Sequence, residues 1–148
     1  MQTSTLTHGP PRQQAVVFGT GEEVMSGLTD WATANELPAT SFTGIGAFSE
    51  ATLGYYDLDE QEYAEIPVPD QVEVLALTGD ITRDGSDGWQ VHAHVVCGRR
   101  DGSTIGGHLL RAVTRPTLEL VLTTSPDHLQ RRHDPASGLA LIAPDENS

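Results

Sequence analysis

The sequence predicts an α+β protein with a mainly antiparallel sheet of seven or eight strands and one helix near the N-terminus. Short apolar segments with an alternating pattern fill most of the chain, and turns rich in Gly or acidic residues separate them. One early stretch has helical spacing instead. A length of 148 residues is that of one domain with its own core.

The chain is expected to begin with a strand over Gln13–Gly19 and a helix directly after it. Thr20 and Glu23 have the spacing of a capping box, in which Thr20 is the N-cap. The helical spacing extends to about Asn35. The apolar residues that share one face of this helix are Val24, Leu28, Trp31 and Ala32.

The remaining segments are expected to be strands. They are Ser41–Phe48, Ala51–Asp57, Glu62–Ile66, Val72–Ile81, the hairpin around residue 101, Pro116–Thr124 and Leu139–Ile142. Glu73 shares its predicted strand face with Leu75 and Leu77, so it is either a partly buried carboxylate or a strand-end residue near solvent. We expect residues 1–11 to be frayed, residues 12–142 to form a single domain, and residues 143–148 to be an acidic tail.

The hairpin Val91–Leu110 carries the strongest chemical signal. Alternation places His92 and His94 on one strand face, and a turn at Asp101-Gly102 brings His108 opposite His94 on that face. Three imidazoles directed at one point are the ligand set of an open tetrahedral zinc site, and other divalent metals also accept them. The alternative is a hydrogen-bonded structural cluster, and a register slip of one residue would move His108 to the other face.

Charge and composition limit the function further. All eight basic residues are Arg, and 21 acidic residues give a net charge of −13, which disfavours binding to nucleic acid. The pairs Arg99-Arg100 and Arg131-Arg132 are interpreted as solvated turns. The single cysteine, Cys97, falls on the face opposite the histidines and is interpreted as a buried core thiol. No apolar run has the length of a signal peptide or membrane span, so we expect a cytoplasmic protein without membrane association.

Six motifs follow one another in a fixed order between Arg12 and Ile142. They are Gly-Glu at 21–22, Gly-Ile-Gly-Ala at 44–47, Leu-Gly-Tyr-Tyr-Asp at 53–57, Glu-Val-Leu-Ala-Leu-Thr-Gly-Asp-Ile at 73–81, His-Ala-His-Val at 92–95 and Gly-Gly-His-Leu at 106–109. With these motifs in this order, the chain resembles the PPC domain (plants and prokaryotes conserved domain) in its stand-alone prokaryotic form.

The resemblance implies a domain that assembles as a homotrimer and has a fold similar to that of acetolactate decarboxylase. It also implies that His92, His94 and His108 hold a divalent metal, with zinc favoured. Plant members carry an Arg-Gly-Arg-Pro segment, the AT-hook, that enters the DNA minor groove. This chain has no such segment.

Two classes of function remain open from the sequence. In the first, the protein holds a metal and acts on a small molecule as a lyase or hydrolase, with Glu73 as general acid or base and Arg111 or Arg12 as an anion clamp. The alternative interpretation of Glu73 is a non-catalytic carboxylate at a strand end that pairs with an Arg. In the second, the domain is a non-catalytic protein-interaction module, or a DNA-associated regulator as in plant relatives.

Overall fold

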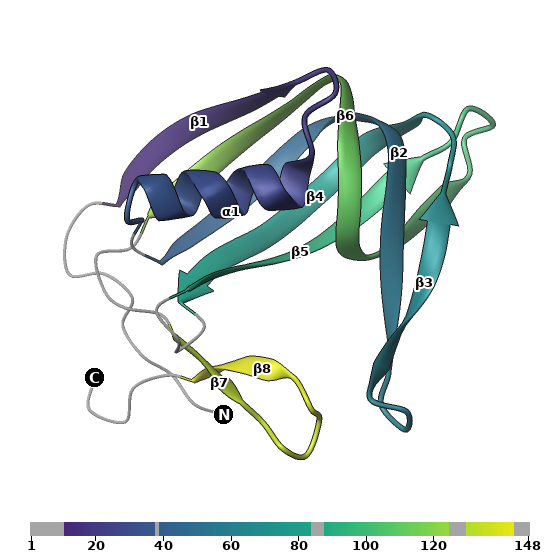
Figure 1. The fold of residues 1–148 in the computed structure, drawn as a ribbon. Coiled ribbons are helices and arrows are strands. Elements are labelled where there is room, and N and C mark those ends of the chain that lie inside the picture. The colour runs from purple at the N-terminus through teal and green to yellow at the C-terminus, as the bar shows by residue number, and fades with distance from the viewer. Residues whose placement is uncertain (1–10, 38, 84–87, 125–129, 144–148) are drawn as a thin grey trace.

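The computed structural model describes residues 11–37, 39–83, 88–124 and 130–143, which form one helix and eight strands (Figure 1). In chain order these are β1 (Arg12–Gly19), α1 (Val24–Ala34), β2 (Thr40–Asp57), β3 (Glu62–Val68), β4 (Val72–Arg83), β5 (Trp89–Gly98), β6 (Thr104–Thr124), β7 (Gln130–His133) and β8 (Ala140–Ala143). The predicted fold class is confirmed. Apart from residues 11 and 143, the predicted frayed end and acidic tail lie outside the described residues. No described helix is long and apolar enough to cross a membrane.

Two long strands, β2 and β6, organise the sheet because each changes neighbours along its length. The first half of β2 lies between β4 and the second half of β6, and its second half lies between β3 and the first half of β6. The first half of β6 also pairs with β5, and its second half pairs with β1. Since β5 pairs with β4, the strands β2, β6, β5 and β4 close a ring that β1 and β3 extend (Figure 1).

The two strands predicted over Ser41–Phe48 and Ala51–Asp57 are one strand in the structure. Its pairing with β6 shifts in register between Gly46 and Phe48, between Phe48 and Glu50, and again after Thr52. Such bulges bend and twist a strand without ending it. The bends allow β2 to belong to both halves of the ring.

The helix begins three residues later than the capping-box prediction required. Glu23, not Thr20, is the N-cap, and its side chain accepts a hydrogen bond from the backbone N–H of Ser26 at 2.6 Å. The backbone before the helix runs beside β6, where Gly21 N–H donates to the carbonyl of Thr114 at 2.9 Å. Residues 20–21 form a turn in which Gly21 has a φ of 90°, and the hydroxyl of Thr20 donates to the Pro116 carbonyl instead of capping the helix.

The core lies between α1 and the inner face of the ring. Val24, Leu28 and Ala32 of the predicted helical stripe are fully buried, whereas Trp31 is only partly buried. Cys97 is buried as predicted. The largest fully buried side chains of the strands are Phe48, Leu53, Leu77, Ile81, Leu109, Leu118, Leu120 and Leu122.

The prediction of which β4 side chains share a face of the sheet is wrong beyond the first residues of the strand. Leu77 is buried and Ala76 is exposed, the reverse of the simple alternation. The pairing of β4 with β5 shifts between Val74 and Ala76, and the extra residue inverts the alternation after that point. Glu73 and Leu75 do share the solvent-facing side, where Leu75 is 52% exposed.

The C-terminal part contains a second small hairpin. β8 matches the predicted strand over Leu139–Ile142 within one residue, and it pairs with β7. The interpretation of Arg131-Arg132 as a solvated turn is wrong for Arg131, whose exposure is only 7%. Arg132 is exposed, because the two residues point to opposite sides of β7.

Candidate metal site

The hairpin register that the sequence predicts is the one in the structure. His94 pairs with His108, and the turn between β5 and β6 closes with Gly102 N–H donating to the Arg99 carbonyl at 2.9 Å. Gly102 has a φ of 84°, which favours glycine at this position. The carboxylate of Asp101 accepts the N–H of Ser103 at 2.9 Å and so stabilises the turn.

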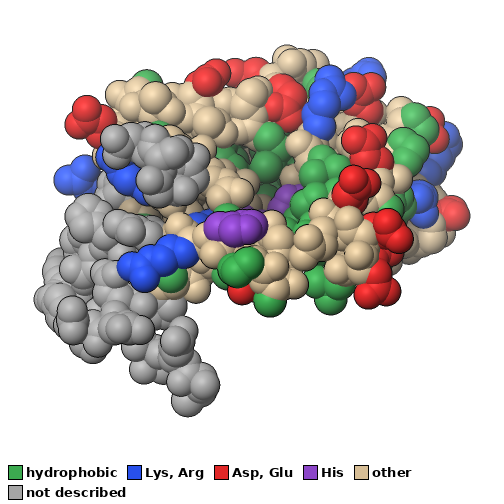
Figure 2. Space-filling model, turned by 60° about the horizontal axis from the view of Figure 1, so that its bottom comes forward, with side chains coloured by type: hydrophobic (Ala, Val, Ile, Leu, Met, Phe, Trp, Pro, Cys, Tyr) green, Lys and Arg blue, Asp and Glu red, His purple; other side chains and the backbone are tan. Residues whose placement is uncertain are grey.

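The three histidines therefore meet on the outer face of the sheet. Figure 2 shows histidine side chains at the surface of the molecule, with hydrophobic side chains beside them. Their ring centroids are 5.1–5.2 Å apart, and one ligand atom from each lies within 4.8 Å of the other two. The Nε2 atoms of His92 and His94 are 3.3 Å apart. Two nitrogens that each lie about 2.0–2.1 Å from a tetrahedral zinc are about 3.3–3.4 Å apart, so this pair has the spacing of a zinc site.

Burial and the neighbouring basic groups favour the neutral forms of His94 and His108 by lowering their pKa values. Burial, together with repulsion from His92, His94 and Arg131, lowers the pKa of His108 to about 4. Burial, followed by repulsion from His92, lowers the pKa of His94. Neutral imidazole is the form that binds a metal, so His94 and His108 are available as ligands at neutral pH.

Tyr63 of β3 covers the ring of His108. The ring centroids are 4.7 Å apart at 32°, and the Tyr63 hydroxyl lies 3.4 Å from Nδ1 of His108. The Tyr63 ring reaches this position by crossing Gly54, the partner of His108 on β2. A Cβ atom at Gly54 would lie 2.7 Å from Cδ1 of Tyr63, so this crossing requires glycine. The remaining ring nitrogen of His108, Nε2, is left for a metal.

A buried ion pair lies beside His92. Asp80 is the partner of His92 on β4, and Nη2 of Arg131 donates to both of its carboxylate oxygens at 2.8 Å. The same Nη2 lies 3.0 Å from Nδ1 of His92, and Oδ2 of Asp80 lies 3.6 Å from that nitrogen. Burial tends to raise the pKa of Asp80, but the interactions with His92 and with the Arg131 guanidinium outweigh it and lower that pKa. The carboxylate is therefore ionised at neutral pH.

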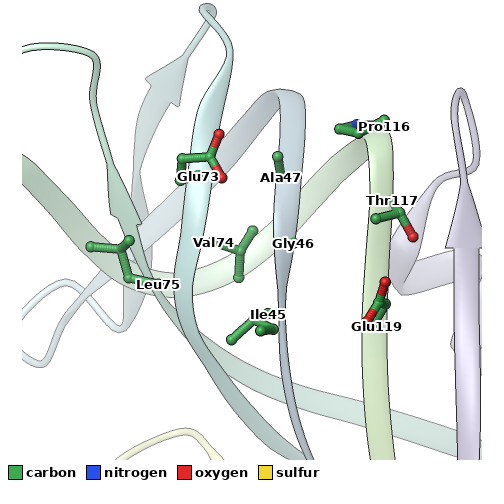
Figure 3. A pocket seen from close by; sticks show the side chains of 9 residues that line it. All are labelled: Ile45, Gly46, Ala47, Glu73, Val74, Leu75, Pro116, Thr117 and Glu119. Atoms are coloured by element: carbon green, nitrogen blue, oxygen red, sulfur yellow. The ribbon is translucent and has the colours of Figure 1, made fainter.

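Glu73, the candidate general acid or base, lies away from the histidines. It precedes Asp80 by seven residues on β4, which corresponds to about 23 Å at ~3.3 Å per residue. Glu73 instead lines a groove of about 550 Å³ with Ile45 and Glu119 (Figure 3). Both carboxylates stand on the rim of an otherwise largely apolar surface.

The two candidate anion clamps are also elsewhere. Arg12 begins β1 and pairs with Thr124 at the far end of β6. Nη1 of Arg111 donates to the carboxylate of Glu50 at 2.8 Å, and both side chains are about half exposed. The structure thus brings the three predicted metal ligands together and leaves Glu73, Arg12 and Arg111 outside the cluster.

Three neighbours of the histidines were not found by sequence reasoning. Asp80 could have been found, because a hairpin between β4 and β5 places it opposite His92. The only sequence signal for Tyr63 was its place in a predicted strand, because its contact with His108 depends on a glycine in a neighbouring strand. Arg131 offered no signal, since it comes from a hairpin that docks at long range.

The model of the Plants and Prokaryotes Conserved (PCC) domain family matches residues 7–126. The chain belongs to this family, as its ordered motifs predicted. No curated protein matches the chain significantly.

Solved structures show the same fold. A plant- and prokaryote-conserved (PPC) protein from Pyrococcus horikoshii is 25% identical with a TM-score of 0.87, and the alignment covers 99% of each chain. A protein from Archaeoglobus fulgidus, described as metal-containing, is 24% identical with a TM-score of 0.85 over 95% of this chain and 99% of that one. A Bacteroides thetaiotaomicron protein with a provisional DNA-binding description is 27% identical, with a TM-score of 0.84 over 88% and 91%.

A more distant similarity concerns the fold alone. The α-acetolactate decarboxylase of Bacillus subtilis is 12% identical with a TM-score of 0.59, over 86% of this chain and 59% of that one. The predicted similarity to acetolactate decarboxylase is therefore confirmed at the level of the fold.

Proposed function

We propose that this protein binds one divalent metal ion per chain, with zinc favoured, through Nε2 of His92, His94 and His108. The observation that carries the proposal is the convergence of three imidazoles, two of them at the spacing of tetrahedral zinc ligands. The archaeal protein described as metal-containing has the same fold, which agrees with the proposal. The proposal depends mainly on the positions of the three histidines in this chain.

Three protein ligands leave a fourth position for water or a small molecule. A zinc ion at such a position polarises a bound carbonyl or lowers the pKa of bound water, which is the chemistry of a metal-dependent lyase or hydrolase. We therefore propose a small-molecule ligand at this position. Within one chain, Glu73, Arg12 and Arg111 lie outside the histidine cluster, so the proposal rests on the three histidines alone.

The test is elemental analysis of protein purified without chelator, for the wild type and two variants. We expect about one zinc per chain in the wild type, loss of the metal in His94→Ala, and full retention in His133→Ala, which changes an exposed histidine of β7. Retention of a full complement of metal by a folded His94→Ala protein would disprove the site.

We further propose that the chain forms a homotrimer through the outer face of β1, β2, β4 and β6. Four apolar side chains on this face are between 52% and 63% exposed, and they border a groove of about 560 Å³. These residues are Val17, Ile45, Leu75 and Val121. Contiguous exposed apolar surface on a soluble protein marks an interaction site.

Light scattering after size exclusion tests the assembly. We expect Ile45→Glu to convert trimers into folded monomers, because it introduces an unpaired charge into an apolar interface. Leu58→Glu, which changes an apolar side chain of similar exposure (67%) in the β2–β3 turn, is the control and stays trimeric. A trimeric Ile45→Glu protein would place the interface elsewhere.

The second candidate is a non-catalytic interaction module, because the same apolar face is also suitable for a partner protein. DNA-associated regulation is the weaker form of this candidate, since a net charge of −13 repels the phosphate backbone. Duplex binding at physiological salt would favour it over the metal-centred function. A cytoplasmic location stays a prediction.

A further inference from the structure

The C-terminal hairpin β7–β8 lies beyond residue 126, where the match to the family ends, yet it contacts the candidate metal site. Arg131 of β7 binds Asp80, and the hydroxyl of Tyr56 donates to the Ser137 carbonyl in the β7–β8 turn at 2.8 Å. These contacts join the hairpin to β4 on one side and to β2 on the other. The guanidinium of Arg131 is thereby fixed beside His92.

The donors and acceptors around His92 impose a condition on metal binding. Arginine has no acceptor, so its contact with Nδ1 of His92 at 3.0 Å places an N–H against the lone pair of that nitrogen. Neutral His92 then carries its proton on Nε2, the atom that faces His94. A metal on Nε2 needs the lone pair there, so the proton has to move to Nδ1. Oδ2 of Asp80 lies 3.6 Å from Nδ1, slightly beyond hydrogen-bond distance, so a small approach of the carboxylate would let it accept that proton.

We propose, building on the metal site proposed above, that Arg131 is a positioning residue for the metal. It holds Asp80 so that the carboxylate accepts the Nδ1 proton of His92 and His92 presents its Nε2 lone pair. Arg131 can release Nδ1 without losing Asp80, because Nε also donates to Oδ1 and Nη1 is held by the Ala140 carbonyl at 2.9 Å. Carboxylates that orient metal-binding histidines in this way are a common feature of zinc sites.

If Arg131 acted only through its charge, its removal would strengthen metal binding. A guanidinium in contact with a ligand of a divalent cation repels that cation, so its loss would tighten metal binding. If Arg131 acts by positioning Asp80, its loss weakens metal binding. The sign of the change therefore separates the two roles.

The experiment is a zinc competition titration against a chromophoric chelator. We expect Arg131→Gln and Asp80→Asn each to bind zinc about 10–100-fold more weakly than the wild type, still at one per chain. Because Arg131 acts through Asp80, the double variant should be no weaker than Asp80→Asn within about threefold. Arg132→Gln removes the same charge from the exposed neighbour and is the matched control.

Unchanged or tighter binding by Arg131→Gln overturns the positioning role. A wild type that binds no zinc overturns the metal site itself, so the two failures are distinguishable. A second measurement on the wild type does not depend on any variant folding. Long-range ¹H–¹⁵N spectra should show the His92 proton on Nε2 in chelator-treated protein and on Nδ1 after zinc is added. A His92 without an Nδ1 proton in the zinc-loaded protein also overturns the proposal.

Discussion

Glu23 joins the start of α1 to the sheet, and its removal should destabilise the whole domain. Oε2 accepts hydrogen bonds from the N–H and the hydroxyl of Ser26, both at 2.6 Å, and Oε1 accepts the backbone N–H of Ala112 on β6 at 3.1 Å. Burial tends to raise the pKa of Glu23, but these hydrogen bonds outweigh it and lower that pKa. A charged acceptor therefore serves both the helix and the strand.

The magnitude follows from the two contacts that Glu23→Ala removes. Loss of an N-cap side chain costs about 1 kcal/mol. Loss of a charged acceptor costs about 1.5–3 kcal/mol, and water replaces part of it because the site is only partly buried. We expect a loss of about 2–3 kcal/mol in the free energy of unfolding, or about 4–12 °C in Tm for a chain of this size.

Calorimetry and urea unfolding measure this loss. Asp30→Ala, an exposed change on the same helix, is the control and should remain within about 0.5 kcal/mol of the wild type. A Glu23→Ala protein as stable as the Asp30→Ala protein would refute the assignment of Glu23 as the joint between helix and sheet.

Three further predictions follow from individual side chains. Folding lowers the pKa of His108 from 6.5 to about 4, so the unfolded chain binds the extra proton between these pH values and stability falls as the pH drops through this range. After allowance for solvent screening, the free energy of unfolding of the chelator-treated wild type should fall by about 1–2 kcal/mol more than that of His108→Gln between pH 7 and 4.5. An equal fall in the two proteins would contradict this prediction. Gly54→Ala should push the Tyr63 ring off His108, because the new Cβ would lie 2.7 Å from Cδ1 of Tyr63. Unchanged aromatic proton shifts of Tyr63 would speak against this. Burial raises the pKa of Cys97 to about 11, so a disulfide reagent at pH 8 should label this thiol only after unfolding, and rapid labelling of the native protein would show that the site is open.

The C-terminal hairpin completes the surroundings of the proposed metal site. The histidines lie within the family-matched region, but the ion pair that contacts His92 depends on Arg131 from outside it. A fragment ending near residue 126 would retain the three histidines and leave Asp80 without its guanidinium partner. From the positioning role proposed for Arg131, we expect such a fragment to bind zinc more weakly than the whole chain.

The sequence by itself determined the features that depend on short-range geometry. Alternation along β5 assigned His92 and His94 to one face, and the tight turn at Asp101-Gly102 fixed the register that brings in His108. A hairpin turn leaves few registers open, so a local signal was sufficient to locate the three candidate ligands. The helical stripe from Val24 to Ala32 was fixed in the same way.

The tertiary structure alone decided the rest, because the decisive interactions join residues far apart in the sequence. Bulges in β2 and β4 adjust each strand to several partners, and one extra residue was enough to bury Leu77 against the predicted pattern. Tyr63 reaches His108 only because a glycine of β2 lies between them. Arg131 reaches His92 only because a separate hairpin pairs with β4, and that pairing joins residues far apart in the sequence that no local pattern relates.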